Sequence, residues 1–189
     1  MTETMVQTER LRVVRPDMGR AAEGLAYMLE NRGHLAPWSH FYPDSFELDG
    51  WKRRLDRQAE EEASGRGLHR WVETLEHPGL VAGMLSFTNV VQGTQSGCDL
   101  GYSLGAEHQG HGLMYEALSV VIPLAVRTLA LHRVKACYVP ENARSAALLR
   151  RLGFEIEGYA RDMLWINGGW RDHVITSLIL PGAQPPSAP

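Results

Sequence analysis

Residues 107–118 read EHQGHGLMYEAL. Two glycines, Gly110 and Gly112, stand one residue apart after a strand-like run and open a long apolar helix pattern. Glycines at such a place let backbone N–H groups face outward, and the first turn of the helix adds unpaired N–H groups and the positive end of its dipole. The stretch therefore predicts an anion-binding loop that is best suited to a diphosphate.

Strand and helix patterns surround this loop in an irregular order. The predicted strands are 8–15, 68–76, 80–89, 98–104, 133–139, 154–166 and 170–180, and the predicted helices are 17–31, 49–63, 112–130 and 143–151. Several strands follow one another through short turns, which favours a mixed α/β (α+β) sheet over a doubly wound fold. We expect one domain over 8–180 and a disordered Pro/Ala/Ser tail over 181–189.

Composition excludes several classes of protein. The 189 residues carry a formal charge of −3, which argues against a general nucleic-acid binder and suits a cationic acceptor. The chain has no apolar run of about 18 residues, which predicts no membrane span. Residues 1–10 are polar and lack a signal-peptide core, so we expect a cytoplasmic protein. The two cysteines, Cys98 and Cys137, lie in strand patterns as expected for buried free thiols.

Two familiar phosphate-binding patterns do not match the glycine loop. A nucleotide P-loop needs a lysine followed by serine or threonine after its last glycine, and a dinucleotide fold needs a third glycine after the first strand. The segment 109–114, QGHGLM, instead resembles the Gln/Arg-x-x-Gly-x-Gly/Ala pyrophosphate loop of the GCN5-related N-acetyltransferases (GNAT). Met114 departs from the small last residue of that pattern.

The resemblance extends over about residues 8–180. It includes LGYSL at 100–104, NARS at 142–145 and LLRRLGFE at 148–155. Within the superfamily the chain looks most like the ribosomal-protein-alanine N-acetyltransferases, through 109–118, EGYA at 157–160 and GWRDH at 169–173. The resemblance implies a six- to seven-stranded, mostly antiparallel sheet with helices on both faces. It also implies acetyl transfer from acetyl-CoA to a protein N-terminal amine, such as that of a ribosomal protein.

The same resemblance implies a set of residues for coenzyme A. The strand at 102–104 can pair its backbone with the amide-bearing pantetheine arm, and the loop N–H groups can take the diphosphate. Asn142 can both cap the next helix and bind the arm, and Arg144 can meet a phosphate. The predicted cofactor residues are Tyr102, Ser103, Leu104, Gln109, Gly110, His111, Gly112, Leu113, Met114, Asn142 and Arg144.

Acetyl transfer from a thioester needs an uncharged amine and a proton for the departing thiolate. An α-amine has a pKa of about 7.7–8.0, so a weak base or a water chain is enough. Asp99 is the first candidate base, and its alternative role is that of a salt-bridged strand carboxylate. Glu116 is the second candidate, and it can instead be a partner of the helix dipole. Relatives use a serine or a tyrosine as the acid; the tyrosine position holds Leu149, which leaves Ser145, unless it is only a first-turn serine.

The acceptor site is expected from the aromatic segment 34–45 and the last hairpin. Trp38, His40 and Tyr42 form either a hydrophobic plug between helices or a wall of this site. Asp172 is the predicted hairpin residue, and strand alternation lets only one of Asp172 and His173 face the site. No metal is predicted, since His108 and His111 lack further ligands.

Three functions remain open on the sequence alone. The first is an N-acetyltransferase for a protein N-terminus, and the second is one for a small amine such as an antibiotic, a polyamine or an amino acid. The third is a non-catalytic acyl-CoA-binding module. We expect no direct nucleic-acid or membrane partner, and a monomer or a homodimer.

Overall fold

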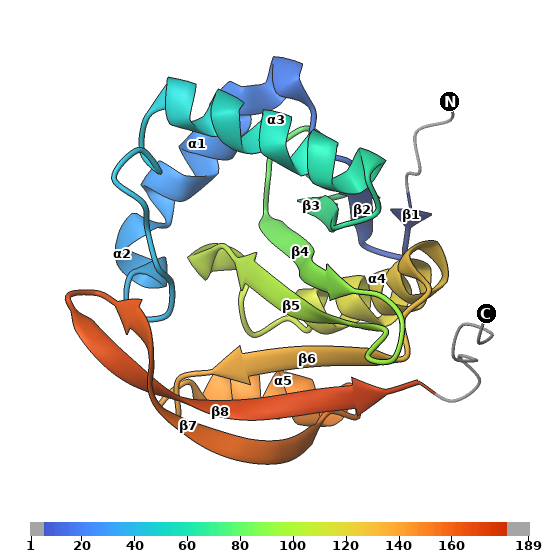
Figure 1. Cartoon of the computed structure of the whole chain (residues 1–189). Helices are drawn as coiled ribbons and strands as arrows, with labels where there is room; N and C mark the ends of the chain where they lie inside the picture. The colour runs from blue at the N-terminus through green and yellow to red at the C-terminus, as the bar shows by residue number, and fades with distance from the viewer. Residues whose placement is uncertain (1–5, 181–189) are drawn as a thin grey trace.

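One eight-stranded sheet organises the chain, of which a computed structural model describes residues 6–180 (Figure 1). Its strand order is β1-β2-β3-β4-β5-β6-β8-β7, and every neighbouring pair is antiparallel except β5 and β6. This confirms the predicted mixed, mostly antiparallel sheet. The strands are β1 Val6–Gln7, β2 Leu11–Val14, β3 Leu68–Thr74, β4 Gly83–Val91, β5 Gly97–Leu104, β6 Arg133–Tyr138, β7 Glu155–Ile166 and β8 Gly169–Ile179.

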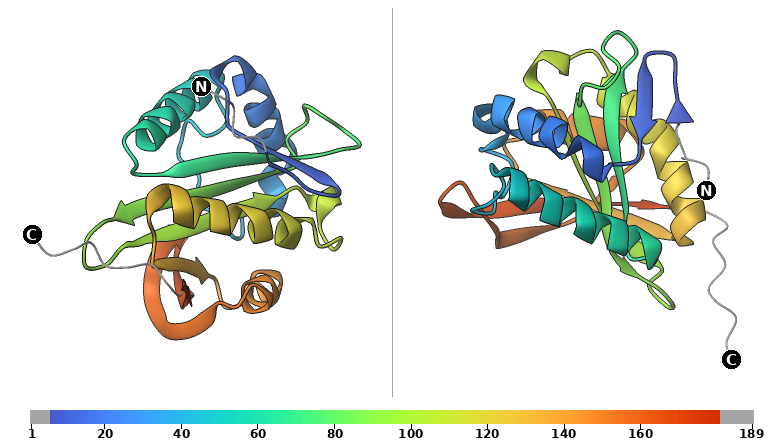
Figure 2. Two further views of the ribbon diagram at one scale, coloured as in Figure 1. Left: turned by 90° about the vertical axis from the view of Figure 1, so that its right-hand side faces the viewer. Right: turned by 90° about the horizontal axis from the view of Figure 1, so that it is seen from above.

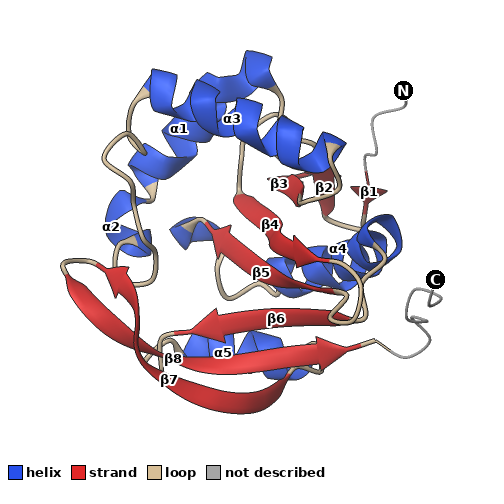
Figure 3. Ribbon diagram, in the orientation of Figure 1, coloured by secondary structure: helices blue, strands red, loops and turns tan. Residues whose placement is uncertain are grey.

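The sheet has one strand more than predicted, because the two residues of β1 pair with β2. The helices lie on both of its faces, α1 and α3 on one and α4 and α5 on the other (Figures 2 and 3). The tail predicted over 181–189 lies outside the described residues. The helices are α1 Ala21–Glu30, α2 Arg32–Leu35, α3 Leu48–Ala63, α4 Leu113–Leu129 and α5 Ala143–Arg151, with 3-10 turns at Met18–Arg20 and Ala106–His108.

Alternation along the strands divides the core into two apolar clusters. Leu68 and Val72 of β3 pack with α4, whose Leu118 is fully buried. Trp71, between them in sequence, points to the other face and meets Trp51 of α3 edge to face at 6.4 Å. A Cβ at Gly24 of α1 would come within 2.8 Å of the Trp51 ring, so this glycine allows α1 to approach α3 closely.

The sheet splits between β5 and β6, which diverge in Figure 1. β5 pairs with β4 along its whole length, from Gly97 to Leu104. It pairs with β6 only where residues 97–99 meet residues 133–135. The remaining part of β5, residues 100–104, therefore has an edge that no strand covers.

The last hairpin agrees with its sequence signature. Asn167 and Gly168 both have positive φ, 49° and 82°, and they connect the paired residues Ile166 and Gly169. Two such residues form the tight turn whose twist suits an antiparallel hairpin. Before the turn, β7 also has a bulge at Asp162, where it contains extra residues relative to β8. Within residues 6–180 no helix combines the length and the apolar character needed to cross a membrane.

Candidate active site

Two cavities lie on the two sides of β5. The first, which we call the loop cavity, has a volume of about 620 Å³ and is lined by β5, the glycine loop, β6 and α5. The second, the α3 cavity, has a volume of about 660 Å³ and lies between α3 and strands β3–β5. A few residues line both cavities and mark the place where the cavities adjoin. These shared residues are Leu35, Ser39, His40, Gly101, Tyr102 and Ser103.

The glycine loop has the backbone geometry that its sequence predicts. Gly110 and Gly112 have φ of +83° and +75°, in the left-handed region where a side chain is strained. Gly112 is the N-cap of α4, so the first N–H groups of that helix are presented at the loop. Gln109, Gly110, Gly112, Leu113 and Met114 line the loop cavity, whereas the predicted His111 is exposed and does not.

Polar side chains from three elements meet at the loop. Arg144 of α5 donates to Gln109 Oε1 at 2.6 Å, and Gln109 Nε2 lies 2.7 Å from His34 Nε2 of α2. Arg151 stacks over the Tyr115 ring at 3.7 Å. His34 and Arg151 line the cavity but were not predicted, because α2 has no sequence signal and Arg151 resembles any cation at a helix C-terminus.

A pair of hydroxyl groups also lines the loop cavity. Tyr102 Oη and Ser145 Oγ are 2.6 Å apart, so the structure joins the predicted acid to a tyrosine of β5. Burial raises the pKa of Tyr102 to about 12, which keeps its phenol protonated. The Ser145 N–H donates to Asn142 Oδ1 at 3.0 Å, which confirms that Asn142 caps α5.

The open edge of β5 offers backbone donors to the same cavity. The Gly105 N–H bonds to Ala82 O, on the β4 side of the strand. Because backbone N–H groups alternate along a strand, those of Leu104 and Tyr102 point away from β4, toward the gap before β6. Ser103 and Leu104, both predicted cofactor residues, line the loop cavity.

The two predicted bases line neither cavity. Asp99 accepts from Lys135 Nζ at 2.9 Å and from Asn89 Nδ2 at 2.8 Å, where β5 and β6 are still paired. Glu116 accepts hydrogen bonds from the Thr8 hydroxyl and from the backbone N–H and the guanidinium of Arg10. Burial alone would raise the pKa of Glu116, but these hydrogen bonds outweigh it and keep the pKa below its usual value. Both carboxylates therefore hold structure together, which does not support the role of base.

The aromatic segment 34–45 is both a packed element and a cavity wall. Phe41 and Phe46 stack edge to face at 5.1 Å, as expected for a plug. Trp38 lines the loop cavity, Tyr42 lines the α3 cavity, and His40 lines both.

The same segment is tied to the last hairpin. His40 Nδ1 donates to the Trp165 carbonyl at 3.0 Å, which links the segment to the tip of β7. On β8, His173 rather than the predicted Asp172 faces the loop cavity. Asp172 accepts from Tyr159 Oη at 2.6 Å and from the Asp162 N–H at 2.8 Å, so it fixes the β7 bulge.

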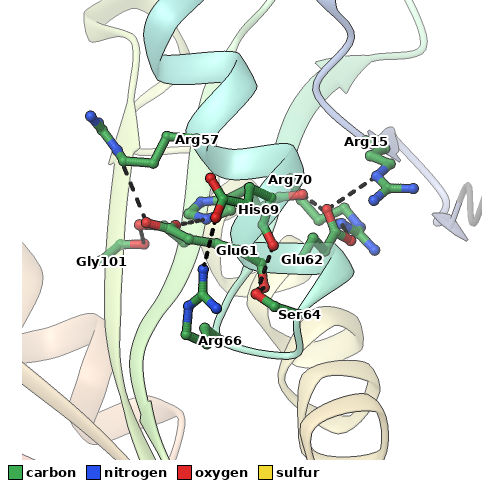
Figure 4. A network of polar contacts seen from close by, with 11 residues as sticks. Arg15, Arg57, Glu61, Glu62, Ser64, Arg66, His69, Arg70 and Gly101 are labelled. Carbon is green, nitrogen blue, oxygen red and sulfur yellow. Dashed lines mark hydrogen bonds and ion pairs between the residues drawn. The ribbon is translucent and has the colours of Figure 1, made fainter.

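Charged and polar groups concentrate in the α3 cavity. His69 Nε2 donates to Glu61 at 2.8 Å, while Arg70 is held by Glu62 further along α3 (Figure 4). Burial lowers the pKa of His69 although Glu61 opposes this effect, so its imidazole is neutral at pH 7. Because Nε2 carries the proton, His69 Nδ1 is a bare acceptor, and it is buried without a hydrogen-bond partner.

Neither metal nor thiol chemistry is indicated by residues 6–180. No three His, Cys, Asp or Glu side chains gather there as a metal-binding group. Cys98 is a buried free thiol, as predicted, and burial raises its pKa to about 12. Cys137 is only half-buried and lines the loop cavity, and burial raises its pKa as well.

Comparisons with known proteins agree with this geometry. A family described as "Acetyltransferase (GNAT) domain" matches residues 10–155. The chain is 44% identical over 185 residues to [ribosomal protein uS5]-alanine N-acetyltransferase of Escherichia coli (strain K12), covering 94% of this chain and 92% of that protein. The crystal structure of ribosomal-protein-S5-alanine acetyltransferase from Vibrio fischeri superposes with a TM-score of 0.91 at 33% identity, over 97% of this chain and 100% of that one.

A further similar structure contains the coenzyme. Mycobacterium smegmatis RimJ in complex with CoA-disulfide superposes with a TM-score of 0.83 at 26% identity, over 89% of this chain and 81% of that one.

Proposed function

The chain belongs to the acetyltransferase (GNAT) family, as an acetyl-CoA-dependent N-acetyltransferase, and we propose that its acceptor is the N-terminal alanine of ribosomal protein uS5. The observation that carries the proposal is the 44% identity, over nearly the whole chain, to an enzyme named for that acceptor. The cytoplasm, where ribosomal proteins are made, is the compartment that goes with this proposal.

In this proposal the loop cavity binds acetyl-CoA. The diphosphate lies on the N–H groups of residues 109–114, at the N-terminus of α4, with Arg144 and Arg151 as nearby cations. The pantetheine arm runs in the gap between β5 and β6, where its amides meet the free backbone of residues 100–104. This path leads the thioester to the place where the two cavities adjoin.

The acceptor then enters from the α3 cavity, on the other side of β5. Its amine nitrogen attacks the thioester carbonyl carbon, the C–N bond forms, and the C–S bond breaks to release CoA thiolate. A backbone N–H of β5 can donate to the carbonyl oxygen as negative charge builds on it. Holding the two reactants in line supplies much of the rate, up to about 7–11 kcal/mol for well-oriented groups.

Two proton transfers accompany the reaction in this proposal, one from the acceptor amine and one to the departing thiolate. An α-amine has a pKa of about 7.7–8.0, so a useful fraction is uncharged at neutral pH and solvent can accept the proton. Ser145 passes a proton to the thiolate sulfur and regains one from solvent through the Tyr102 hydroxyl, so that the serine is neutral again after each turnover. The Tyr102 phenol, kept protonated by burial, donates to Ser145 Oγ and so directs the serine proton toward the sulfur.

Turnover on three acceptor classes tests the proposal. The first is a peptide with a free N-terminal alanine, the second is the same peptide with a blocked N-terminus and an internal lysine, and the third is a set of polyamines and aminoglycosides. We expect acetylation of the first, with mass spectrometry placing the acetyl group on the α-amine. Turnover on the small amines alone would reject a protein acceptor, and binding of acetyl-CoA without acetyl loss to any amine would indicate a non-catalytic module.

A further inference from the structure

Arg54 of α3 is a cation without a counter-ion in the α3 cavity. The other arginines that line this cavity are paired: Arg53 with Asp44 at 2.6 Å, Arg57 with Glu61 at 4.0 Å, and Arg70 with Glu62 at 2.7 Å. Within residues 6–180 the Arg54 guanidinium has no hydrogen bond or ion pair, and it only stacks over the Trp51 ring at 4.8 Å. Burial and the neighbouring Arg57 lower the pKa of Arg54.

The surroundings of Arg54 also contain unused hydrogen-bonding groups. Gln58 lies one helical turn further along α3, and its Oε1 is buried without a partner, as is His69 Nδ1 across the cavity. Buried polar atoms are costly when nothing satisfies them, and most in native proteins have a partner. Their concentration in one cavity, beside an unpaired guanidinium, indicates that the cavity is built for a polar ligand.

The position of Arg54 indicates that this polar ligand is a part of the acceptor molecule. Arg54 lines the α3 cavity together with Tyr42 and Ser103. Tyr27 Oη donates to Ser103 Oγ at 2.9 Å, and Ser103 lines both cavities. Arg54 therefore lies in the cavity that we propose for the acceptor, and its positive charge is opposite in sign to the net charge of −3 of the whole chain.

We propose that Arg54 binds the carboxylate of an acidic side chain close to the N-terminus of the acceptor, so that the enzyme selects acidic over basic acceptor sequences. A guanidinium suits this ligand because its donors match the two oxygens of a carboxylate. This proposal differs from the expectation of a cationic acceptor that was drawn from the net charge. The inference rests on the proposed protein acceptor. It specifies, in addition, which residues the enzyme prefers after the terminal residue of that acceptor.

A peptide series tests the proposal. Short peptides begin with alanine followed by glycine and serine, and a single glutamate is moved from the second to the fifth position. Peptides with glutamine or lysine at the same positions serve as references. We expect kcat/KM to be higher for glutamate than for lysine at one of these positions, by about 10- to 100-fold, which is the range for a hydrogen-bonded charge.

Two variants of α3 show whether Arg54 is the cause. Arg54→Glu should reverse the order, so that the lysine peptide becomes the better substrate, with unchanged affinity for CoA. Lys52→Glu makes the same change of charge on the same helix, at a side chain that is 51% exposed and lines neither cavity, and it should keep the wild-type order. A misfolded enzyme would lose activity on all peptides and could not produce a reversal.

The outcomes distinguish a failure of the proposed acidic selectivity from a failure of the proposed N-terminal acetylation. Equal turnover of glutamate, glutamine and lysine peptides by the wild type would reject the selection of acidic acceptors while the proposed N-terminal acetylation stands. An unchanged preference in Arg54→Glu would reject Arg54 as its origin. Absence of turnover on every peptide, with CoA still bound, would reject the proposed function and this inference with it.

Discussion

The two cavities beside β5 are built in different ways. Besides its side chains, the loop cavity presents ordered backbone groups: the N–H groups after Gly110 and Gly112, the start of α4, and the uncovered edge of β5. The α3 cavity presents side chains from separate segments, among them Arg54, Gln58 and His69. A backbone site is suited to a ligand that never changes, whereas a side-chain site can be altered one residue at a time, which suits a variable acceptor.

The largest effect is expected where the backbone site is blocked. Gly112→Glu forces a side chain onto a φ of +75° and adds a negative charge beside the diphosphate. We expect CoA affinity to fall on the order of 1,000-fold, about 4 kcal/mol, as measured by calorimetry.

Gly65→Glu is the control for this change. It has a φ of +69°, nothing lies within 4 Å of its added Cβ, and it carries the same backbone strain at the end of α3. Unchanged affinity in Gly112→Glu, or an equal loss in Gly65→Glu, would contradict the assignment of the loop to the diphosphate.

The next effect concerns the chemistry of the loop cavity. Ser145→Ala should lower kcat on the order of 100-fold, which is within the usual contribution of a positioned acid, and leave CoA affinity intact. Tyr102→Phe should lower kcat less, because it removes the partner and not the donor. In the double variant the losses should not add, since the two hydroxyls act as one unit. Stopped-flow measurement of CoA release checks these values, and a kcat of Ser145→Ala equal to wild type at every pH would remove Ser145 as the acid.

A third prediction concerns pH and the α3 cavity. Burial lowers the folded-state pKa of His69, so below pH 6.5 the unfolded chain binds a proton that the folded chain does not. Stability should therefore decrease as pH falls from about 6.5 toward the lowered pKa, with a slope of at most about 1.4 kcal/mol per pH unit. Urea titrations between pH 5 and 8, compared with His69→Gln, measure this slope, and an identical slope in the variant would assign it to other groups.

The smallest effect is expected at the residue that sequence reasoning favoured as base. Asp99→Asn should change kcat by no more than about two-fold, since Asp99 binds Lys135 and Asn89 and lines neither cavity. Its half-exposed ion pair is of the kind that contributes about 0–1 kcal/mol to stability. A large loss of kcat with normal stability would restore Asp99 as a catalytic group.

Much of the fold and of the loop cavity was predictable because the signals are local. Glycine spacing, the apolar period of α4 and the Asn167-Gly168 turn all depend on neighbours in sequence, and the structure confirms the elements that they predict. The short elements β1 and α2 were missed, because two to four residues carry no period.

The α3 cavity depended on tertiary structure. Arg54 looks like any charged residue of an amphipathic helix until the structure shows that, of the four arginines lining the α3 cavity, only Arg54 lacks an ion-pair partner among residues 6–180. Asp99 and Asp172 are candidate site residues in the sequence, but the structure shows both bound to structural partners and lining neither cavity.

The sequence alone thus determined the geometry of the glycine loop to which we assign the donor, since a loop that presents its own backbone must encode that geometry in consecutive residues. Tertiary structure decided which side chains line the cavity that we propose for the acceptor, because hydrogen bonds and ion pairs between distant segments determine which charges are satisfied and which remain for a ligand.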